Sequence, residues 1–423
     1  MRVLRWLTYL EPIWLLVMLV TFWQFSPERD AWLPLLYLTP LFWGARWLSY
    51  RRLGSFTPLT FWLLALVGLM ALNVYTAPFT WYNRTVNGLF ILGRPLLGML
   101  LIFYFIEYAR NYKKTNLLLT ATTILGLLLG IIALVATQWN NKSDQLGVIL
   151  DLLPVMLNLP GMKGGFNANE IAGALIYLLP VLAALAVYRW RLKLPRMGVS
   201  IAFILVFAAL FLGQSRLAII GMLAALGLVA WLVAPAGRWR SLALLVVILV
   251  GIFQVLIMNN VFDLGRRSSM RARDEISYSN RTGMWRSALA IIQDYPLTGV
   301  GMNMYRAAPV RQLYPVKNYE TRVLPHAHNE WLQLGADLGV PGLIGFAGLY
   351  LITAYMLLVS YQRGSDDMKA LAVGVFAGLI AHGVFGMGDA IPWWDRFSFV
   401  FWWLLALAGA AYIHTKNRDR LTR

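Results

Sequence analysis

Residues Arg322–Gly342 read RVLPHAHNEWLQLGADLGVPG and join a polar segment to a long apolar one. The stretch carries His326 and His328, two of the four histidines in the chain. Asn329 follows directly and is a residue type that caps helices, because its side chain accepts a hydrogen bond from an unpaired N–H of the first turn. The apolar run after Gly342 then predicts that the capped helix enters a membrane.

The predicted helix carries three polar residues on one face and an interruption in its backbone hydrogen bonding. Glu330, Gln333 and Asp337 are spaced so that they share a face. Pro341 has no N–H to donate to the Asp337 carbonyl, so we expect a kink near it. Polar and titratable groups at the edge of a membrane are costly to bury and mark functional sites, which makes His328 the first candidate site residue.

The composition of the chain is that of an integral membrane protein. Of its 423 residues 59% are hydrophobic and only 13% are charged, and the mean hydropathy is +0.62, whereas soluble domains carry about 25% charged residues. The net charge of +18 is explained by Lys and Arg in cytoplasmic loops and by contact with anionic lipid. We therefore expect membrane lipids and no nucleic acid as partners. The chain has no cysteine and hence no disulfide.

Twelve apolar segments are long enough to be membrane spans. They lie near residues 9–25, 31–48, 57–75, 86–109, 117–137, 170–188, 198–214, 216–234, 241–258, 331–360, 370–386 and 397–414. With the N-terminus inside, the inner segments carry twenty Lys and Arg and the short outer loops carry five, which favours this orientation. We predict an all-α polytopic membrane protein, residues 1–423 forming one transmembrane domain with both termini cytoplasmic. The long loop 259–330, between spans nine and ten, is predicted to be an outer subdomain.

The histidine segment also carries a family resemblance. His328 and Asn329, followed after nine residues by Gly339–Gly342, resemble the signature of the O-antigen ligase and polymerase superfamily. Its members are membrane glycosyltransferases that move glycans from a polyprenyl diphosphate carrier. Further elements that resemble this family occur at Asn280-Arg281, Pro296–Gly301 and Gln214–Arg216.

The resemblance implies a catalytic role for three residues and substrate binding for others. His328 would be the general base that deprotonates an acceptor hydroxyl, since an unperturbed histidine titrates near 6.5, close to neutrality. Arg216 and Arg281 would neutralise the departing diphosphate in place of a metal ion. Substrate contacts are expected from Asn280, His326 and Asn329.

The arginines also have simpler interpretations. Arg281 could form a surface ion pair with a carboxylate, and Arg216 could extend its side chain to the membrane interface. Arg266 and Arg267 begin an arginine-rich run just outside a helix end. We expect them to bind phosphates of the lipid carrier, and the alternative is attachment to lipid headgroups. Arg94, within span four, has no explanation from the sequence.

Several absences indicate a reaction without cofactors. No Gly-Lys dipeptide occurs, which excludes a phosphate-binding P-loop and direct use of ATP. No His-x-x-x-His pair and no cluster of outer acids predicts a metal site, so we expect a metal-independent enzyme. Asp389 and Asp395 flank the aromatic segment Pro392–Trp394. This segment could stack on a sugar or anchor the chain at the membrane interface, and we favour the anchor.

Together with the resemblance, these features predict a Gram-negative inner-membrane enzyme whose active site faces the periplasm. It would transfer O-antigen glycan, with inversion, from undecaprenyl diphosphate to a sugar hydroxyl of lipid A–core. An O-antigen polymerase that extends lipid-linked repeat units is the alternative within the family. A protein O-oligosaccharyltransferase and a lipid-glycan transporter without covalent chemistry are two further alternatives.

Overall fold

The computed structural model describes most of the chain after residue 38. The described residues are 6–7, 10, 14, 17, 39–51, 55–79, 90–112, 115–139, 144–154, 164–188, 196–258, 267–316, 326–391, 393 and 395–422. The helices are α3 (Thr39–Tyr50), α4 (Pro58–Thr76), α5 (Phe90–Tyr112), α6 (Thr115–Ala136), α7 (Asp144–Leu150), α8 (Ala168–Tyr188), α9 (Arg196–Leu212), α10 (Arg216–Val233), α11 (Arg238–Met258), α12 (Arg267–Asp294), the 3-10 helix η4 (Met304–Arg306), α13 (Ala308–Leu313), α14 (Glu330–Arg363), α15 (Asp366–Phe385) and α16 (Ser398–Thr422). Two short strands, β1 (Thr137–Gln138) and β2 (Phe166–Asn167), pair in parallel.

The prediction of an all-α polytopic membrane protein is confirmed. Within the described residues, nine helices are long and apolar enough to cross a membrane, and α9 is a shorter apolar helix. These ten helices coincide with ten of the twelve predicted spans. The predicted span 9–25, and the part of span 31–48 before α3, fall on residues that are outside this description apart from three isolated positions.

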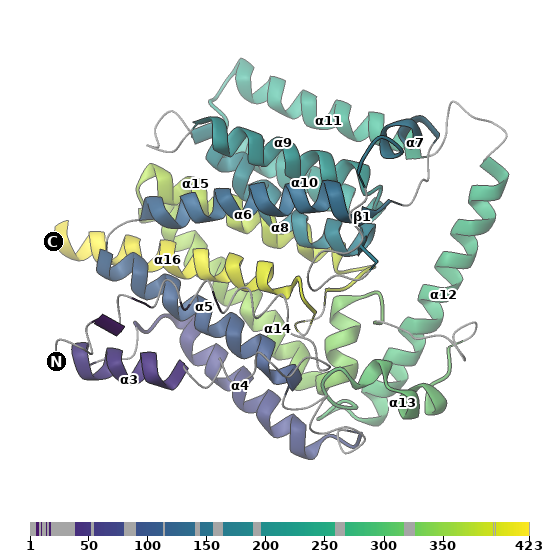
Figure 1. Ribbon diagram of the computed structural model, residues 1–423, viewed down its shortest axis with the longest axis horizontal. Helices are drawn as coiled ribbons and strands as arrows, with labels where there is room; N and C mark the ends of the chain where they lie inside the picture. Colours follow the sequence, from purple (N-terminus) through teal and green to yellow (C-terminus); the bar gives the residue numbers. More distant parts are fainter. Residues whose placement is uncertain are drawn as a thin grey trace.

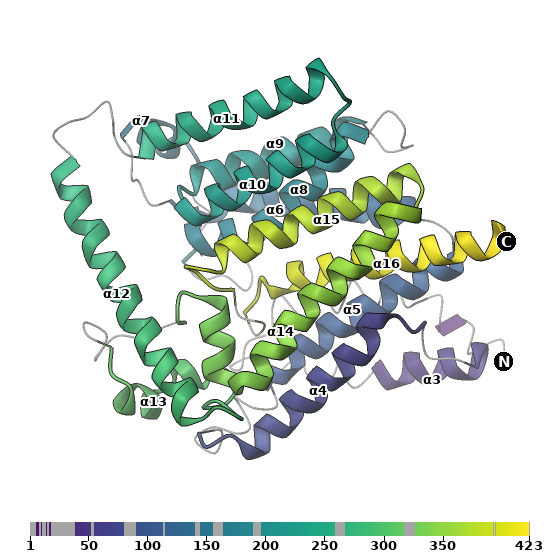
Figure 2. The same ribbon diagram turned by 180° about the vertical axis from the view of Figure 1, so that it is seen from behind.

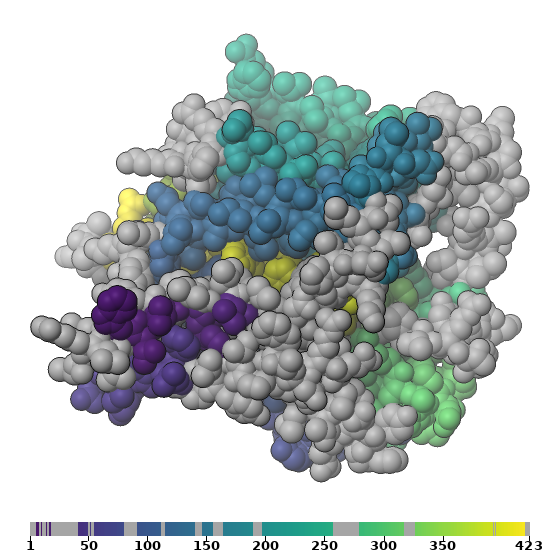
Figure 3. Space-filling model, viewed as in Figure 1, coloured from purple at the N-terminus to yellow at the C-terminus, as the bar shows by residue number. Residues whose placement is uncertain are grey.

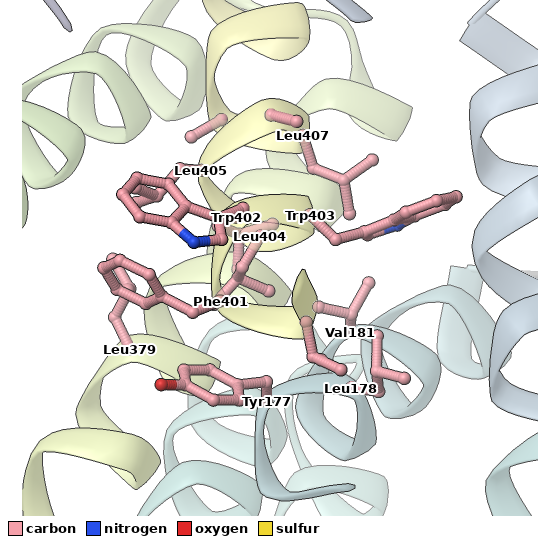
Figure 4. Packing of buried hydrophobic residues seen from close by; sticks show 14 of the residues in the cluster. Tyr177, Leu178, Val181, Leu379, Phe401, Trp402, Trp403, Leu404, Leu405 and Leu407 are labelled. Carbon is pink, nitrogen blue, oxygen red and sulfur yellow. The ribbon is translucent and has the colours of Figure 1, made fainter. Parts of the chain in front are cut away.

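The bundle is built around α8 and α16, whose apolar side chains are almost completely enclosed by other helices. In Figure 4, Phe401 and Trp402 of α16 lie beside Leu379 of α15 and Tyr177 of α8. A helix that is apolar all round is expected to be buried in this way. These two helices therefore form the fixed centre against which the others pack.

The peripheral helices present apolar side chains outward. Leu117, Ile124, Leu128 and Ile131 of α6 are each about half exposed, and α6 forms part of the molecular surface, in blue, with α16 in yellow beneath it (Figure 3). Soluble monomers rarely expose contiguous apolar patches of this kind. This is the surface expected of helices in contact with lipid.

Five of the long helices begin at the same end of the bundle. Figure 1 shows that α5, α8, α10, α14 and α16 all start at the end where α12 and α13 lie, whereas α3 and the C-terminal end of α16 lie at the other. The same arrangement is seen from behind in Figure 2, where α12 stands along this end of the bundle. We call it the α12 end. The partial positive charges of five helix N-termini are therefore gathered there.

Helix α14 is broken near its start, as predicted, but at Gly339 rather than at Pro341. Gly339 has φ 70°, a left-handed conformation that favours glycine. The turn that follows α12, residues 296–301, packs against the break, and we call this backbone contact the interlock. The N–H groups of Val300 and Gly301 donate to the carbonyls of Ala336 and Asp337 at 2.8 and 3.1 Å, and the Val340 N–H donates to the Pro296 carbonyl at 2.7 Å.

This interlock leaves no space for side chains at two glycines. A Cβ at Gly339 would lie 2.5 Å from the Pro296 oxygen, and a Cβ at Gly299 would lie 2.5 Å from the Ala336 oxygen. The two glycine motifs identified in the sequence are thus parts of one backbone contact. Around it the described part of loop 259–330 packs in a second, smaller apolar core, formed by Phe79, Met284, Ala288, Ile291, Val300, Met304, Tyr305, Val310, Val316, Ala327 and Ala336.

The interlock gives a stability prediction. Gly339→Ala should destabilise the protein by at least about 2 kcal/mol, because the new Cβ meets backbone and the left-handed conformation is strained for alanine. The matched control is Gly227→Ala in α10, where an added Cβ meets no atom within 4 Å. Thermal unfolding of the detergent-purified variants should show a lowered midpoint for Gly339→Ala alone. Equal midpoints for the two variants would contradict the interlock.

Candidate functional site

The two histidines of the opening stretch meet a carboxylate from a distant part of the chain. Nδ1 of His328 lies 3.0 Å from Oδ1 of Asp389, and Nε2 of His326 lies 3.7 Å from the same oxygen. Asp389 is buried, and its Oδ1 also accepts the Ala390 N–H at 3.0 Å. His328 remains partly open, with 23% of its side chain exposed. A histidine oriented by a buried carboxylate and open on its other side has the form of a general base.

The hydrogen bonds determine where each imidazole carries its proton. The Asp389 carboxylate accepts from Nδ1 of His328, which leaves Nε2 of His328 unprotonated in the neutral ring and able to accept a proton. In His326 the pattern is reversed, because Nδ1 accepts the backbone N–H of His328 at 3.1 Å. Its proton therefore lies on Nε2, toward Asp389.

The two histidines of the pair are not equivalent. Burial lowers the pKa of His326 to about 4, outweighing the opposite effect of Asp389, so its 3.7 Å contact is not an ion pair at neutral pH. Burial alone would raise the pKa of Asp389, but the hydrogen bond from His328 and electrostatic interactions with His326, His328 and Arg281 bring the pKa below its usual value. Asp389 is thus ionised and can stabilise a protonated His328.

The backbone holds His328 in an unusual conformation. Its φ of 49° lies in the left-handed region, which is uncommon for a residue with a side chain. The carbonyl of His328 accepts a hydrogen bond from Nε1 of Trp285, on α12, at 3.2 Å. Such conformations persist only where surrounding contacts enforce them, and they concentrate at functional sites.

The polar face of α14 provides those contacts. Glu330, Gln333 and Asp337 are all buried, and each accepts a backbone N–H from a different segment. Oε2 of Glu330 accepts from Ile391 at 2.8 Å, Oε1 of Gln333 from Ala327 at 2.8 Å, and Oδ1 of Asp337 from Tyr305 at 2.9 Å. The amide of Gln333 also donates to Asp337.

The same helix start fixes the loop that carries Asp389. Asn329 caps α14 as predicted, accepting the Leu332 N–H at 3.0 Å, while its amide donates to the Met387 carbonyl at 2.9 Å. The Glu330 N–H donates to the Gly386 carbonyl at 2.8 Å. Residues 329 and 330 thus bind the loop on both sides of Asp389.

The loop arginine predicted from the sequence reaches this site. Gly388 lies between α10 and α12, since a Cβ placed on it would meet Leu217 of α10 at 2.3 Å and Nη1 of Arg281 at 3.7 Å. The charge of Arg281 also acts on Asp389. Arg216 precedes Leu217 as the first residue of α10, and its side chain is exposed. The structure therefore brings Arg281, the start of α10 and the histidine pair to one place.

Other predicted residues are placed less directly. Asn280 lies half-buried on α12, one residue before Arg281. Arg266, and the side chain of Arg267, lie outside the described residues. The interpretation of Pro392–Trp394 as an interface anchor is wrong for Trp393. That side chain is fully buried, 5.6 Å from Trp402 and 5.8 Å from Phe346 between ring centroids, because the turn folds into the bundle.

A second group of charges lies beside the histidines and was not recognised from the sequence. Nη2 of Arg306, on η4, lies 3.4 Å from Oδ1 of Asp395, and Nε of Arg396 lies 3.7 Å from Oε1 of Glu170. Arg94, unexplained in the sequence, interacts electrostatically with these four charges. Its position on α5 gave no indication of these partners, which come from three other segments.

The histidine pair and Asp389 also form a possible set of metal ligands. Their ligand atoms all lie within 4.8 Å of one another, a grouping that the sequence did not predict. However, a metal ion on Nε2 of His326 would require the proton to move to Nδ1, where it would oppose the N–H of His328. The hydrogen bonds therefore suit proton transfer better than coordination.

Comparison with known proteins supports a transferase. Residues 201–347 match the model of a protein family described as O-antigen ligase. The matched residues include Arg216, Arg281 and the histidine pair, and the match supports an O-antigen ligase-type membrane protein with glycosyltransferase-like activity. Asp389 lies outside the matched residues. No curated protein matches the chain.

The polar face of α14 yields a prediction about activity. Glu330→Leu removes the acceptor of the Ile391 N–H. It should lower kcat on the order of 10- to 100-fold, because the loop that carries Asp389 is no longer held in position. Glu330→Gln keeps an acceptor oxygen at the same place and should stay close to wild type. The measurement is the initial rate of glycan transfer by purified protein.

A matched control is available on the same helix. Thr353 is buried, and its hydroxyl has no hydrogen-bond partner among the described residues. Thr353→Val should therefore leave kcat unchanged. If Glu330→Gln lost as much activity as Glu330→Leu, the charge of Glu330 rather than its hydrogen bond would be needed, and the positioning role would be refuted.

Proposed function

We propose, from the O-antigen ligase-type match over residues 201–347, that the protein transfers a glycan from undecaprenyl diphosphate to a sugar hydroxyl of lipid A–core. The observation that carries this proposal is the His328–Asp389 pair at 3.0 Å with Arg281 beside it. It supplies the two things that the reaction needs, a base for the acceptor hydroxyl and a positive charge for the leaving diphosphate.

The reaction is a direct displacement. The acceptor oxygen attacks the anomeric carbon, the bond from that carbon to the diphosphate breaks, and its electron pair leaves with the diphosphate. Nε2 of His328 takes the hydroxyl proton, and the ionised Asp389 stabilises the resulting imidazolium. One displacement inverts the configuration at the anomeric carbon.

The arginines act on the leaving group. Negative charge grows on the diphosphate as the glycosidic bond breaks, and a fixed guanidinium at low dielectric stabilises it without reorganisation. Arg281 and Arg216 are assigned to this role, and Asn280, His326 and Asn329 to the surroundings of the substrates. Arg266 and Arg267 are assigned to binding the lipid carrier.

The reaction is proposed to take place at the periplasmic face of a Gram-negative inner membrane. The α12 end corresponds to the outer end in the orientation that the distribution of Lys and Arg favours. The described part of loop 259–330 then belongs to a periplasmic subdomain beside the site. The alternative is a polymerase that extends lipid-linked repeat units. It would use the same base and arginines with a different acceptor.

The function is tested by transfer from purified lipid-linked glycan to rough lipopolysaccharide, analysed on gels. Wild-type protein should produce the ligated product, and His328→Ala should abolish it while unfolding at the wild-type temperature. His326→Ala should cause only partial loss, because His326 supports His328 through its backbone N–H. His414→Ala, on the distant part of α16, is the control.

Three outcomes separate the alternatives. Lengthened lipid-linked glycan without ligation would assign the protein as a polymerase. No transfer to any acceptor by folded wild-type protein would refute the proposed function. Wild-type rates for His328→Ala would refute the base.

The tautomer arrangement predicts activity without a metal ion. Because Nδ1 of His326 is already occupied by the His328 N–H, coordination at the histidine pair would break an existing hydrogen bond. We therefore expect full transfer activity in excess EDTA and without nucleotide. Loss of activity on chelation that Mg²⁺ or Mn²⁺ restores would contradict this and would make His326, His328 and Asp389 ligands.

A further inference from the structure

Three arginines from separate elements meet beside the histidine pair. Arg94 lies on α5, Arg306 on η4, and Arg396 in the turn before α16. Asp395 pairs with Arg306 and Glu170 with Arg396, at N–O distances of 3.4 and 3.7 Å. These distances are longer than those of well-formed charge-assisted hydrogen bonds. We call these five residues the second charged cluster.

The second charged cluster carries an excess positive charge where such charge is costly. Its three arginines exceed its two acids by one. Arg94 lies within a membrane-spanning helix, a position where an ionised residue usually serves a function. The N-termini of α5, α8 and α16 are at the same end of the bundle and add further positive potential. An anion bound there would offset this charge.

The cluster is also open to a ligand. The side chains of Arg306 and Asp395 are 28% and 27% exposed, and those of Arg396 and Glu170 are 36% and 31% exposed. Ion pairs with this much exposure contribute little to the stability of the fold. The guanidinium groups can therefore bind an arriving anion at small cost to the fold.

Arg281 and the second charged cluster act electrostatically on different members of the histidine–aspartate group. Arg281 acts on Asp389, whereas Arg306 and Asp395 act on His326. Arg281 lies on α12 and Arg306 on η4, so these positive charges are supplied by different elements. The leaving diphosphate already occupies Arg281 and Arg216 in the proposed reaction. A second anion at the same site would have to come with the acceptor.

We propose that Arg94, Arg306 and Arg396 form a second anion subsite, which binds a phosphate substituent of the acceptor glycolipid and directs its hydroxyl to His328. This proposal rests on the proposed function. It explains why a partly buried arginine lies in α5 and why it interacts electrostatically with two partly exposed ion pairs. The subsite would select acceptors that carry negative charge near the hydroxyl that is glycosylated.

The test compares two acceptors and four variants. Initial rates are measured at saturating lipid-linked donor, with rough lipopolysaccharide and with the same material stripped of its core phosphates. Arg306→Gln should raise the KM for the phosphorylated acceptor on the order of tenfold, the effect of losing one charge-assisted contact. It should leave the KM for the donor unchanged. It should also leave the KM for the stripped acceptor unchanged.

Two controls accompany this variant. Arg306→Lys keeps the charge and should restore most of the acceptor affinity. Arg286→Gln removes an exposed arginine on α12 and should change neither KM. Arg281→Ala, in contrast, should lower kcat at saturating concentrations of both substrates.

Two outcomes would overturn the subsite. A raised donor KM in Arg306→Gln would assign the cluster to the carrier diphosphate. Unchanged KM values with a lowered unfolding temperature would show that its ion pairs are structural only. If Arg306→Gln does not fold, Arg396→Gln replaces it with the same expectations. Failure of the wild-type protein to transfer glycan at all would instead refute the proposed function.

Discussion

A carboxylate or amide buried where a helix enters a membrane has to be hydrogen-bonded, and this constraint organises the α12 end of the molecule. The buried side chains of Glu330, Gln333 and Asp337 are satisfied by backbone N–H groups of three segments that are not part of α14. Leaving any of them unpaired would cost about 1–3 kcal/mol. The requirement for stability is therefore also what aligns the loop of Asp389 and the histidine segment.

The break in α14 serves the same arrangement. Backbone N–H groups of the turn 299–301 donate to carbonyls that the broken helix leaves free, so the outer segment is attached by its main chain. Tyr305, the partner of Asp337, directly precedes Arg306 of the second charged cluster. One short helix segment before Gly339 thus sets the positions of His328, Asp389 and Arg306.

Much of this was predictable from local sequence. The lengths of the apolar segments predicted the described spans, and Asn329 predicted the start of α14. Pro341 predicted the interruption of this helix to within two residues, since the break lies at Gly339. Long-range pairing was not predictable. Asp389 is 61 residues from His328, and nothing in its neighbourhood distinguishes it from Asp395. The prediction for Trp393 was wrong because an aromatic turn at the end of a span has the same sequence pattern whether it faces lipid headgroups or folds inward.

The central claim is that His328 faces the acceptor hydroxyl while arginines on its Asp389 side hold the diphosphate. A cryo-EM structure of the full chain with a non-transferable lipid diphosphate glycan and a core acceptor tests it most directly. The account predicts the diphosphate against Arg281 and Arg216, and the acceptor hydroxyl within about 3 Å of Nε2 of His328. A diphosphate bound away from both arginines, or an acceptor hydroxyl out of reach of His328, would contradict it.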